Sequence, residues 1–233
     1  EGLLKALDTT SKVEKKVETT NPEAYEFYLK GKHAYDKRKD TNDTEAARDL
    51  LRQAIKLDDN LITAKVQLGT TYSEMGGYDE AMEIYTPTLK QAEKLSDKYG
   101  VGYSLNNIGI VHVNRGDYNK AVEYLEKSLS IQKEIGFKEL ELLTTTYLYL
   151  SYIHLGKDYD EKHLYSLIKD ADNIGYELNF RLYQLLDDTS YLETSYTELQ
   201  DTASEMEEDL SKKFLSYPIP KAIVEEWEKV LPK

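Results

Sequence analysis

The feature that most constrains this chain is a repeat of 40 residues within a length of 233. Gly69 and Ala81 recur 40 positions later as Gly109 and Ala121. A fixed period of this kind is typical of arrays in which each unit buries its apolar face against its neighbours. The repeat therefore predicts an elongated solenoid rather than a domain folded around one central core.

Each unit has the pattern of two antiparallel helices. Leu68 and Tyr72 are four residues apart and share one helix face. Gly76 is suited to ending that helix, because glycine tolerates a positive φ, and Asp79 suits the positive end of a second helix. The small Gly69 would let the second helix approach closely. We therefore expect an all-α fold.

The order Leu-Gly-x-x-Tyr from Leu68, followed by Gly-x-Tyr-x-x-Ala-x-x-x-Tyr from Gly76, resembles the tetratricopeptide repeat. The usual unit has about 34 residues and a closing proline, whereas this chain has a longer period and Asp59 at the proline position. The longer period resembles the extended repeats of kinesin light chain and of bacterial quorum-sensing regulators. The resemblance implies a right-handed superhelix of helix pairs whose concave surface binds proteins or peptides.

The repeat also predicts the domain organisation. We expect residues 1–20 to be a linker or helix from an upstream domain, residues 21–174 to form four repeats, and residues 175–233 to form a degenerate fifth repeat and capping helices. Asn21 followed by Pro22 is a good helix start. The last helices are expected at 207–217 and 219–230, because solenoid ends need caps.

Two segments conflict with the repeat. Residues 143–155 have the β-branched and aromatic content of a strand, but the 40-residue register predicts a helix. Pro87 falls inside a second helix, where it cannot donate a backbone hydrogen bond, so we expect a kink or a break there.

The segment from Ala6 to Arg38, most specifically its part from Asn21 to Gly31, resembles the junction that enters the repeats of bacterial signalling proteins. In those proteins a TolB-like segment commonly lies upstream, often behind a cyclase, a kinase or a DNA-binding domain. This resemblance implies that the chain is the C-terminal regulatory module of a larger bacterial signalling protein. It favours the cytoplasm over the periplasm as the location.

Composition and motifs argue against most chemistry. The chain has no cysteine, and its formal net charge of −13 argues against nucleic-acid binding. We find no apolar run long enough to span a membrane, no metal-binding histidine pair and no nucleotide-binding glycine motif. We therefore expect no enzyme activity, cofactor, metal site or direct membrane contact, and a protein or peptide as the partner.

The resemblance also implies which residues line the concave surface: Tyr28, Lys32, Gln67, Thr70, Tyr103, Asn106, Asn107, Asn114, Tyr147 and His154. Asn107 lies two residues before the motif glycine, where peptide-gripping members of the family often carry an asparagine that contacts the ligand backbone. Gln67 is its counterpart one repeat earlier. Because Lys32 is the only basic residue in this set, we do not expect binding of an acidic C-terminal carboxylate.

Three alternatives remain open at this point. The concave surface could be lined by the chain's own terminal helices, or Asn107 could bond to a neighbouring repeat. The whole chain could also be a self-association module that sets the oligomeric state of its parent. The segment 182–211 carries nine acidic residues and no Lys or Arg, which fits either a solvated face or a contact with a basic partner.

Overall fold

A computed structural model describes residues 21–171 and 174–230, and within them it contains twelve α-helices, one short 3₁₀-helix and no strand. Five antiparallel pairs follow one another: α2 (Pro22–Asp36) with α3 (Thr41–Leu57), α4 (Ile62–Ser73) with α5 (Tyr78–Leu95), α6 (Lys98–Asn114) with α7 (Tyr118–Ile135), α8 (Glu141–His154) with α9 (Glu161–Lys169), and α10 (Tyr176–Leu186) with α11 (Thr189–Ser204). Helices α12 (Glu208–Leu215) and α13 (Pro218–Val230) complete the chain as described. The expected linker at residues 1–20 lies outside the described residues.

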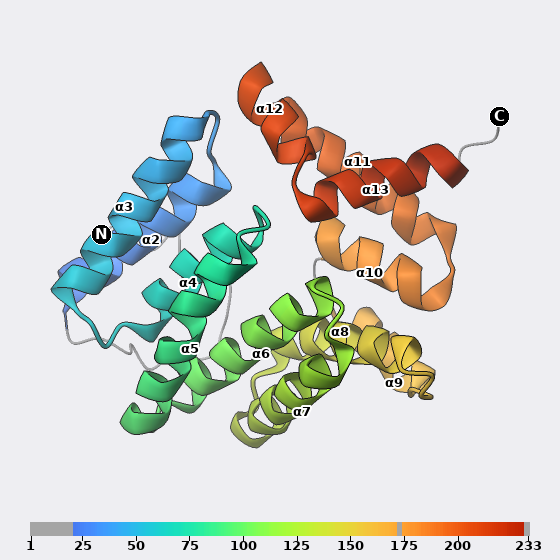
Figure 1. The fold of residues 1–233 in the computed structure, drawn as a ribbon, viewed down its shortest axis with the longest axis horizontal. Helices are drawn as coiled ribbons and strands as arrows, with labels where there is room; N and C mark the ends of the chain where they lie inside the picture. The colour runs from blue at the N-terminus through green and yellow to red at the C-terminus, as the bar shows by residue number, and fades with distance from the viewer. Residues whose placement is uncertain (1–20, 172–173, 231–233) are drawn as a thin grey trace.

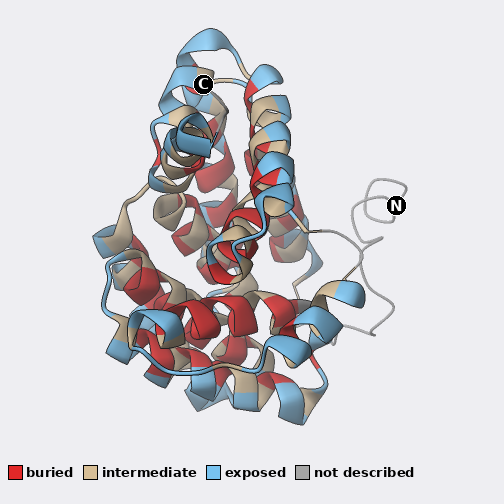
Figure 2. Ribbon diagram, turned by 90° about the vertical axis from the view of Figure 1, so that its right-hand side faces the viewer, coloured by how far each residue is buried: buried red, intermediate tan, exposed pale blue. Residues whose placement is uncertain are grey.

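The pairs form an arc with its first helices on the inner side (Figure 1). Helices α2, α4, α6, α8 and α10 each contact the next in this series. The buried apolar residues form several clusters along the arc, as expected of a solenoid. In Figure 2 the buried segments lie where neighbouring helices meet, and exposed residues follow the loops and outer helix faces. The all-α superhelix predicted from the repeat is confirmed.

Close approach at two glycines sets the spacing within the second and third pairs. A Cβ atom added to Gly69 would lie 2.4 Å from Cε1 of Tyr85, and one added to Gly109 would lie 2.6 Å from Cγ of Leu125. Real side chains do not approach so closely. The expectation that these glycines admit the neighbouring helix is therefore confirmed.

The two segments that conflicted with the repeat are both helical. Residues 143–155 fall almost entirely within α8, which confirms the register over the local composition. Helix α5 continues from Tyr78 to Leu95 through Pro87, so the predicted break does not occur. Tyr85 and Thr88, on either side of the proline, are buried. Their packing holds the helix where propensity alone would end it.

The last helices bring the end of the arc back toward its beginning. The backbone N–H of Glu207 donates to the carbonyl oxygen of Lys39 at 2.9 Å, and Lys37 lies 3.8 Å from Glu205. Pro218 packs against Gly76, at the turn between α4 and α5. The arc is therefore closed by a few contacts between its two ends.

Candidate binding surface on the inner face

Helices α2, α4 and α6 are inner helices of the arc, and they carry eight of the residues expected from the repeat register to line its concave surface (Figure 1). Apart from Asn114, which is bonded to α10, five of the expected residues on these helices are half-buried: Tyr28, Gln67, Thr70, Tyr103 and Asn107. Lys32, on α2, is exposed. We call the half-buried set the open inner face. It combines amide, hydroxyl and phenol groups, which can contact a peptide through both backbone hydrogen bonds and aromatic surface.

Tyr85 connects this face to the outer layer of helices. Its ring passes beside Gly69, and its hydroxyl lies 3.1 Å from Oγ1 of Thr70 and 3.4 Å from Oδ1 of Asn107. Burial raises the pKa of the Tyr85 hydroxyl well above its usual value. The hydroxyl therefore stays protonated and links α5 to α4 and α6.

The Asn107 side chain is hydrogen-bonded to two groups of its own chain. Its Nδ2 donates to the carbonyl oxygen of Tyr103 at 2.9 Å, and its Oδ1 faces the Tyr85 hydroxyl. One of these partners belongs to the preceding repeat, as the structural alternative proposed. A primary amide has two N–H groups and two lone pairs, so half of its hydrogen-bonding capacity is still available to a ligand.

Two of the expected residues are in the interior and cannot line an open surface. Asn106 is 1% exposed, and its Oδ1 accepts from the Thr144 hydroxyl at 2.8 Å. This bond joins α6 to α8 and gives Asn106 a structural role. Tyr147 is fully buried. The register placed both side chains on the inner side of their helices, but neighbouring helices cover them.

Helix α10 is the element that covers the inner face beyond α6. Arg181 is 9% exposed, and one of its terminal nitrogens donates to Oδ1 of Asn114 at 2.6 Å. Its Nε lies 3.4 Å from the Tyr147 hydroxyl, which also donates to Glu177. This end of the inner face is thus occupied by the chain itself, so Asn114 and Tyr147 are bonded internally. We call it the closed inner face.

A carboxyl group with an altered pKa lies at the C-terminal end of α4. Burial raises the pKa of Glu74 to about 7, and the negative charge of Glu177 adds to the effect while Arg38 opposes it. Glu74 is the C-cap of α4, and it corresponds in the repeat to Asn114. Sequence reasoning missed Glu177 and Arg181, whereas the repeat register already placed Glu74 on the concave side. A basic residue within the apolar run of α10 was the available signal.

His154 belongs to a different surface. It is exposed, and its ring stacks on Tyr118, at the start of α7, with 4.1 Å between ring centroids. No group of three or more His, Cys, Asp or Glu side chains among the described residues could hold a metal ion. In the same part of the chain no helix is both long and apolar enough to cross a bilayer.

Comparison with known proteins identifies the repeat. Residues 60–134 match the family model described as "Tetratricopeptide repeat". The photosystem I assembly protein Ycf3 of Rippkaea orientalis is 41% identical over 56 residues, which are 24% of this chain and 31% of that protein. Ycf3 of Cyanophora paradoxa is 33% identical over 67 residues, 29% of this chain and 37% of that protein. The match thus spans about a third of these relatives.

Two solved structures share the fold. Aspartyl phosphate phosphatase F from Bacillus subtilis has a TM-score of 0.61 at 16% identity, with 90% of this chain and 60% of that chain covered. A signal transduction ATPase with numerous domains and a tetratricopeptide repeat sensor, from Pyrococcus horikoshii, has a TM-score of 0.51 at 19% identity, with 100% and 36% covered. At these identities the likeness concerns the fold alone.

Proposed function

We propose that this chain binds an extended protein segment on the open inner face. The proposal starts from the match of residues 60–134 to the tetratricopeptide repeat, a scaffold that generally mediates protein interactions. The observation that carries the proposal is the pair of side-chain amides Gln67 and Asn107, 40 residues apart and both half-buried on adjacent inner helices. Side-chain amides at a regular spacing can pair with a peptide backbone whatever its sequence. Flanking Tyr28 and Tyr103 add contact area at low entropic cost.

The ligand is expected to lie across α2, α4 and α6 only. Arg181 and Glu177 occupy the inner face beside Asn114 and Tyr147, so a segment bound there would have to displace α10. Lys32 remains the single basic residue of the set, which disfavours ligands that rely on a clamped carboxylate. The ligand should therefore be recognised through its backbone and apolar side chains.

Protein binding would suit a regulatory module of a larger bacterial signalling protein. That role rests on the resemblance of the segment from Ala6 to Arg38 to the junctions of such proteins. The Ycf3 relatives are named for assembling a protein complex, which is also a protein-binding task. The match to the tetratricopeptide repeat and the Ycf3 relatives both support a protein-binding scaffold without catalysis.

A peptide selection tests the proposal. The purified chain is used to select binders from a phage-displayed library of random peptides, and the affinity of a selected peptide is measured by calorimetry. Gln67→Ala should weaken binding roughly tenfold if two backbone hydrogen bonds are lost. Asn107→Ala should weaken binding less, because part of the wild-type Asn107 amide is already hydrogen-bonded within the chain and contributes fewer bonds to the ligand. Wild-type affinity in both variants would exclude the open inner face as the binding surface.

Gln53→Ala is the matched control, since Gln53 is exposed on the outer helix α3. It should leave the affinity unchanged. A melting curve of each variant separates lost binding from lost stability. Sedimentation of the unliganded chain tests the alternative, because a self-association module would show a mass that rises with concentration.

A further inference from the structure

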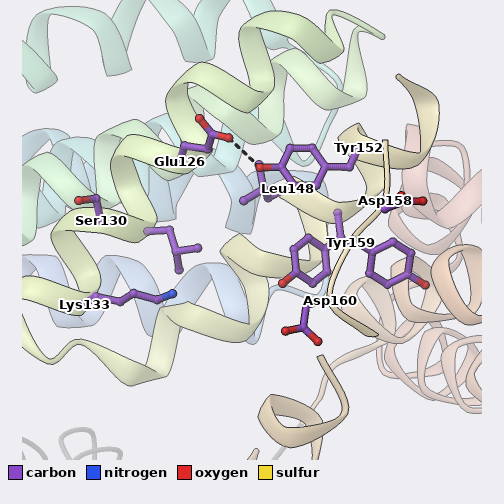
Figure 3. A pocket seen from close by; sticks show the side chains of 10 residues that line it. Glu126, Ser130, Lys133, Leu148, Tyr152, Asp158, Tyr159 and Asp160 are labelled. Carbon is purple, nitrogen blue, oxygen red and sulfur yellow. Dashed lines mark hydrogen bonds between the residues drawn. The ribbon is translucent and has the colours of Figure 1, made fainter. Parts of the chain in front are cut away.

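A hollow lies between α7, α8 and the chain that joins α8 to α9 (Figure 3). Its volume is about 730 Å³. Leu129 and Leu148 contribute apolar surface, and Tyr149, Tyr152 and Tyr159 contribute aromatic surface. We call this hollow the tyrosine cleft. The cleft shares no lining residue with the open inner face.

The cleft exists because the fourth helix pair lacks the motif glycine. Tyr149 occupies the position of Gly69 and Gly109 in the 40-residue register. A tyrosine cannot admit a second helix where a Cβ atom alone would clash. Six residues separate the end of α8 from the start of α9 at Glu161, and α9 has 9 residues where α5 and α7 have 18. Residues 155–160 cross the space instead.

The tyrosine rings are held in fixed positions. The Tyr149 ring lies 5.0 Å from the Tyr159 ring and 6.0 Å from the Tyr152 ring, measured between centroids. The Tyr152 hydroxyl donates to Glu126 at 2.7 Å, and the Tyr159 hydroxyl donates to the carbonyl oxygen of Leu185 at 3.0 Å. The faces of such aromatic rings carry partial negative charge.

The charged groups around the cleft are mostly acidic. Three exposed carboxylates line it: Glu126, Asp158 and Asp160. Lys133 is the basic residue of the lining, and its ammonium group lies 4.0 Å from Glu141. Just outside, the Lys157 ammonium already lies 5.5 Å from the centre of the Tyr152 ring. The site thus combines aromatic faces, surplus carboxylates and one cation of the chain's own beside an aromatic ring.

We propose that the tyrosine cleft binds an arginine side chain of a partner protein. A guanidinium group is planar, so it can stack on a tyrosine face while its N–H groups pair with carboxylates. Lysine would use only one of these contacts at a time. The cleft is larger than one side chain, which leaves room for the residues that flank the arginine.

The test measures binding of the peptide acetyl-Gly-Arg-Gly-amide by calorimetry at low salt. The same peptide with citrulline in place of arginine keeps the shape and removes the charge. Arginine should bind saturably, and citrulline roughly tenfold or more weakly. The double variant Glu126→Gln, Asp160→Asn should weaken arginine binding by a similar factor. Asparagine also caps helices, so α9 should keep its start, which a melting curve checks.

Glu123→Gln is the control, because Glu123 is exposed on α7 but does not line the cleft. It should bind the arginine peptide as the wild type does. Equal binding of arginine and citrulline peptides, or no loss in the double variant, would overturn the proposal. Free L-arginine binding as tightly as the peptide would assign the cleft to a free amino acid and would equally overturn it.

Discussion

The crossings of α6 with α7 and of α8 with α9 occupy equivalent places in the repeat and are built in opposite ways. At the first, Gly109 leaves room for Leu125, and the two helices pack along their length. At the second, Tyr149 fills that room, and α9 is short and makes fewer contacts. The comparison shows that one residue at the crossing decides whether a helix pair is tightly closed or leaves a cleft.

The inner face shows a similar contrast between its two ends. Around Gln67 and Asn107 it is half-buried and faces the inside of the arc, whereas around Asn114 and Tyr147 it is covered by α10. The same periodic positions therefore serve different purposes. In one region they are candidate ligand contacts, and in the other they hold the chain's own C-terminal part.

Replacing Tyr149, at the crossing of α8 with α9, should have the largest effect on the free energy of unfolding. Tyr149 is 8% exposed and packs against two other tyrosines. Tyr149→Ala should lower the free energy of unfolding by about 3 kcal/mol, because the shortened α9 cannot move in to fill the space. Denaturant titration measures the loss. A variant as stable as the wild type would mean that the crossing can close like that of α6 and α7.

Adding a side chain at Gly109, where α6 crosses α7, should lower the free energy of unfolding by somewhat less. Gly109→Leu places atoms where even a Cβ atom would lie 2.6 Å from Leu125. We expect a loss of about 1–3 kcal/mol in the free energy of unfolding from overpacking. Thermal melting followed by circular dichroism reports it. An unchanged melting temperature would count against close packing at this glycine.

The stability of the fold should respond to pH through Glu74, at the C-terminal end of α4. Its pKa is raised from 4.5 to about 7 in the folded chain, so the folded state holds the proton more tightly than the unfolded state. The stability that this group contributes is complete below pH 4.5 and is lost as the pH rises through about 7. The loss is at most about 1.4 kcal/mol per pH unit.

Glu74→Gln isolates this effect from other titrating groups. Burial lowers the pKa of His112. The stability that His112 contributes therefore changes in the opposite direction and increases as the pH rises through its titration range. The difference in melting temperature between variant and wild type should grow from pH 5 to pH 8 in favour of the variant. A constant difference would show that Glu74 does not titrate in this range.

Replacing Gly102, a glycine with room for a side chain, should have the smallest effect, and it should stabilise the fold rather than destabilise it. Gly102 lies on α6, like Gly109, but a Cβ atom there would have its nearest neighbour, Ile131, at 3.7 Å. Gly102→Ala should raise the free energy of unfolding by about 0.5–1 kcal/mol through helix propensity alone. Measured beside Gly109→Leu, it separates crossing glycines from ordinary ones. Destabilisation by this substitution would remove the distinction.

The helical register was predictable because it depends on local pattern. The motif glycines, the helix at residues 143–155 and the helix start at Asn21 all follow from spacing and capping chemistry. The covering of the inner face by α10 was not predictable, since it depends on a bond between Arg181 and Asn114, 67 residues apart. Local propensity at Pro87 left a kink or a break open, and the break does not occur because the packing of α5 outweighs propensity there.

Site-specific crosslinking tests the proposed binding surface most directly. A photoreactive amino acid replaces Gln67 in one variant and Gln53 in another, and each is irradiated with a peptide selected by the wild-type chain. We expect a crosslink from position 67, on the inner helix α4, and none from position 53, on the outer helix α3. Crosslinking from position 53 alone would place the ligand on the outer surface and exclude binding at the open inner face.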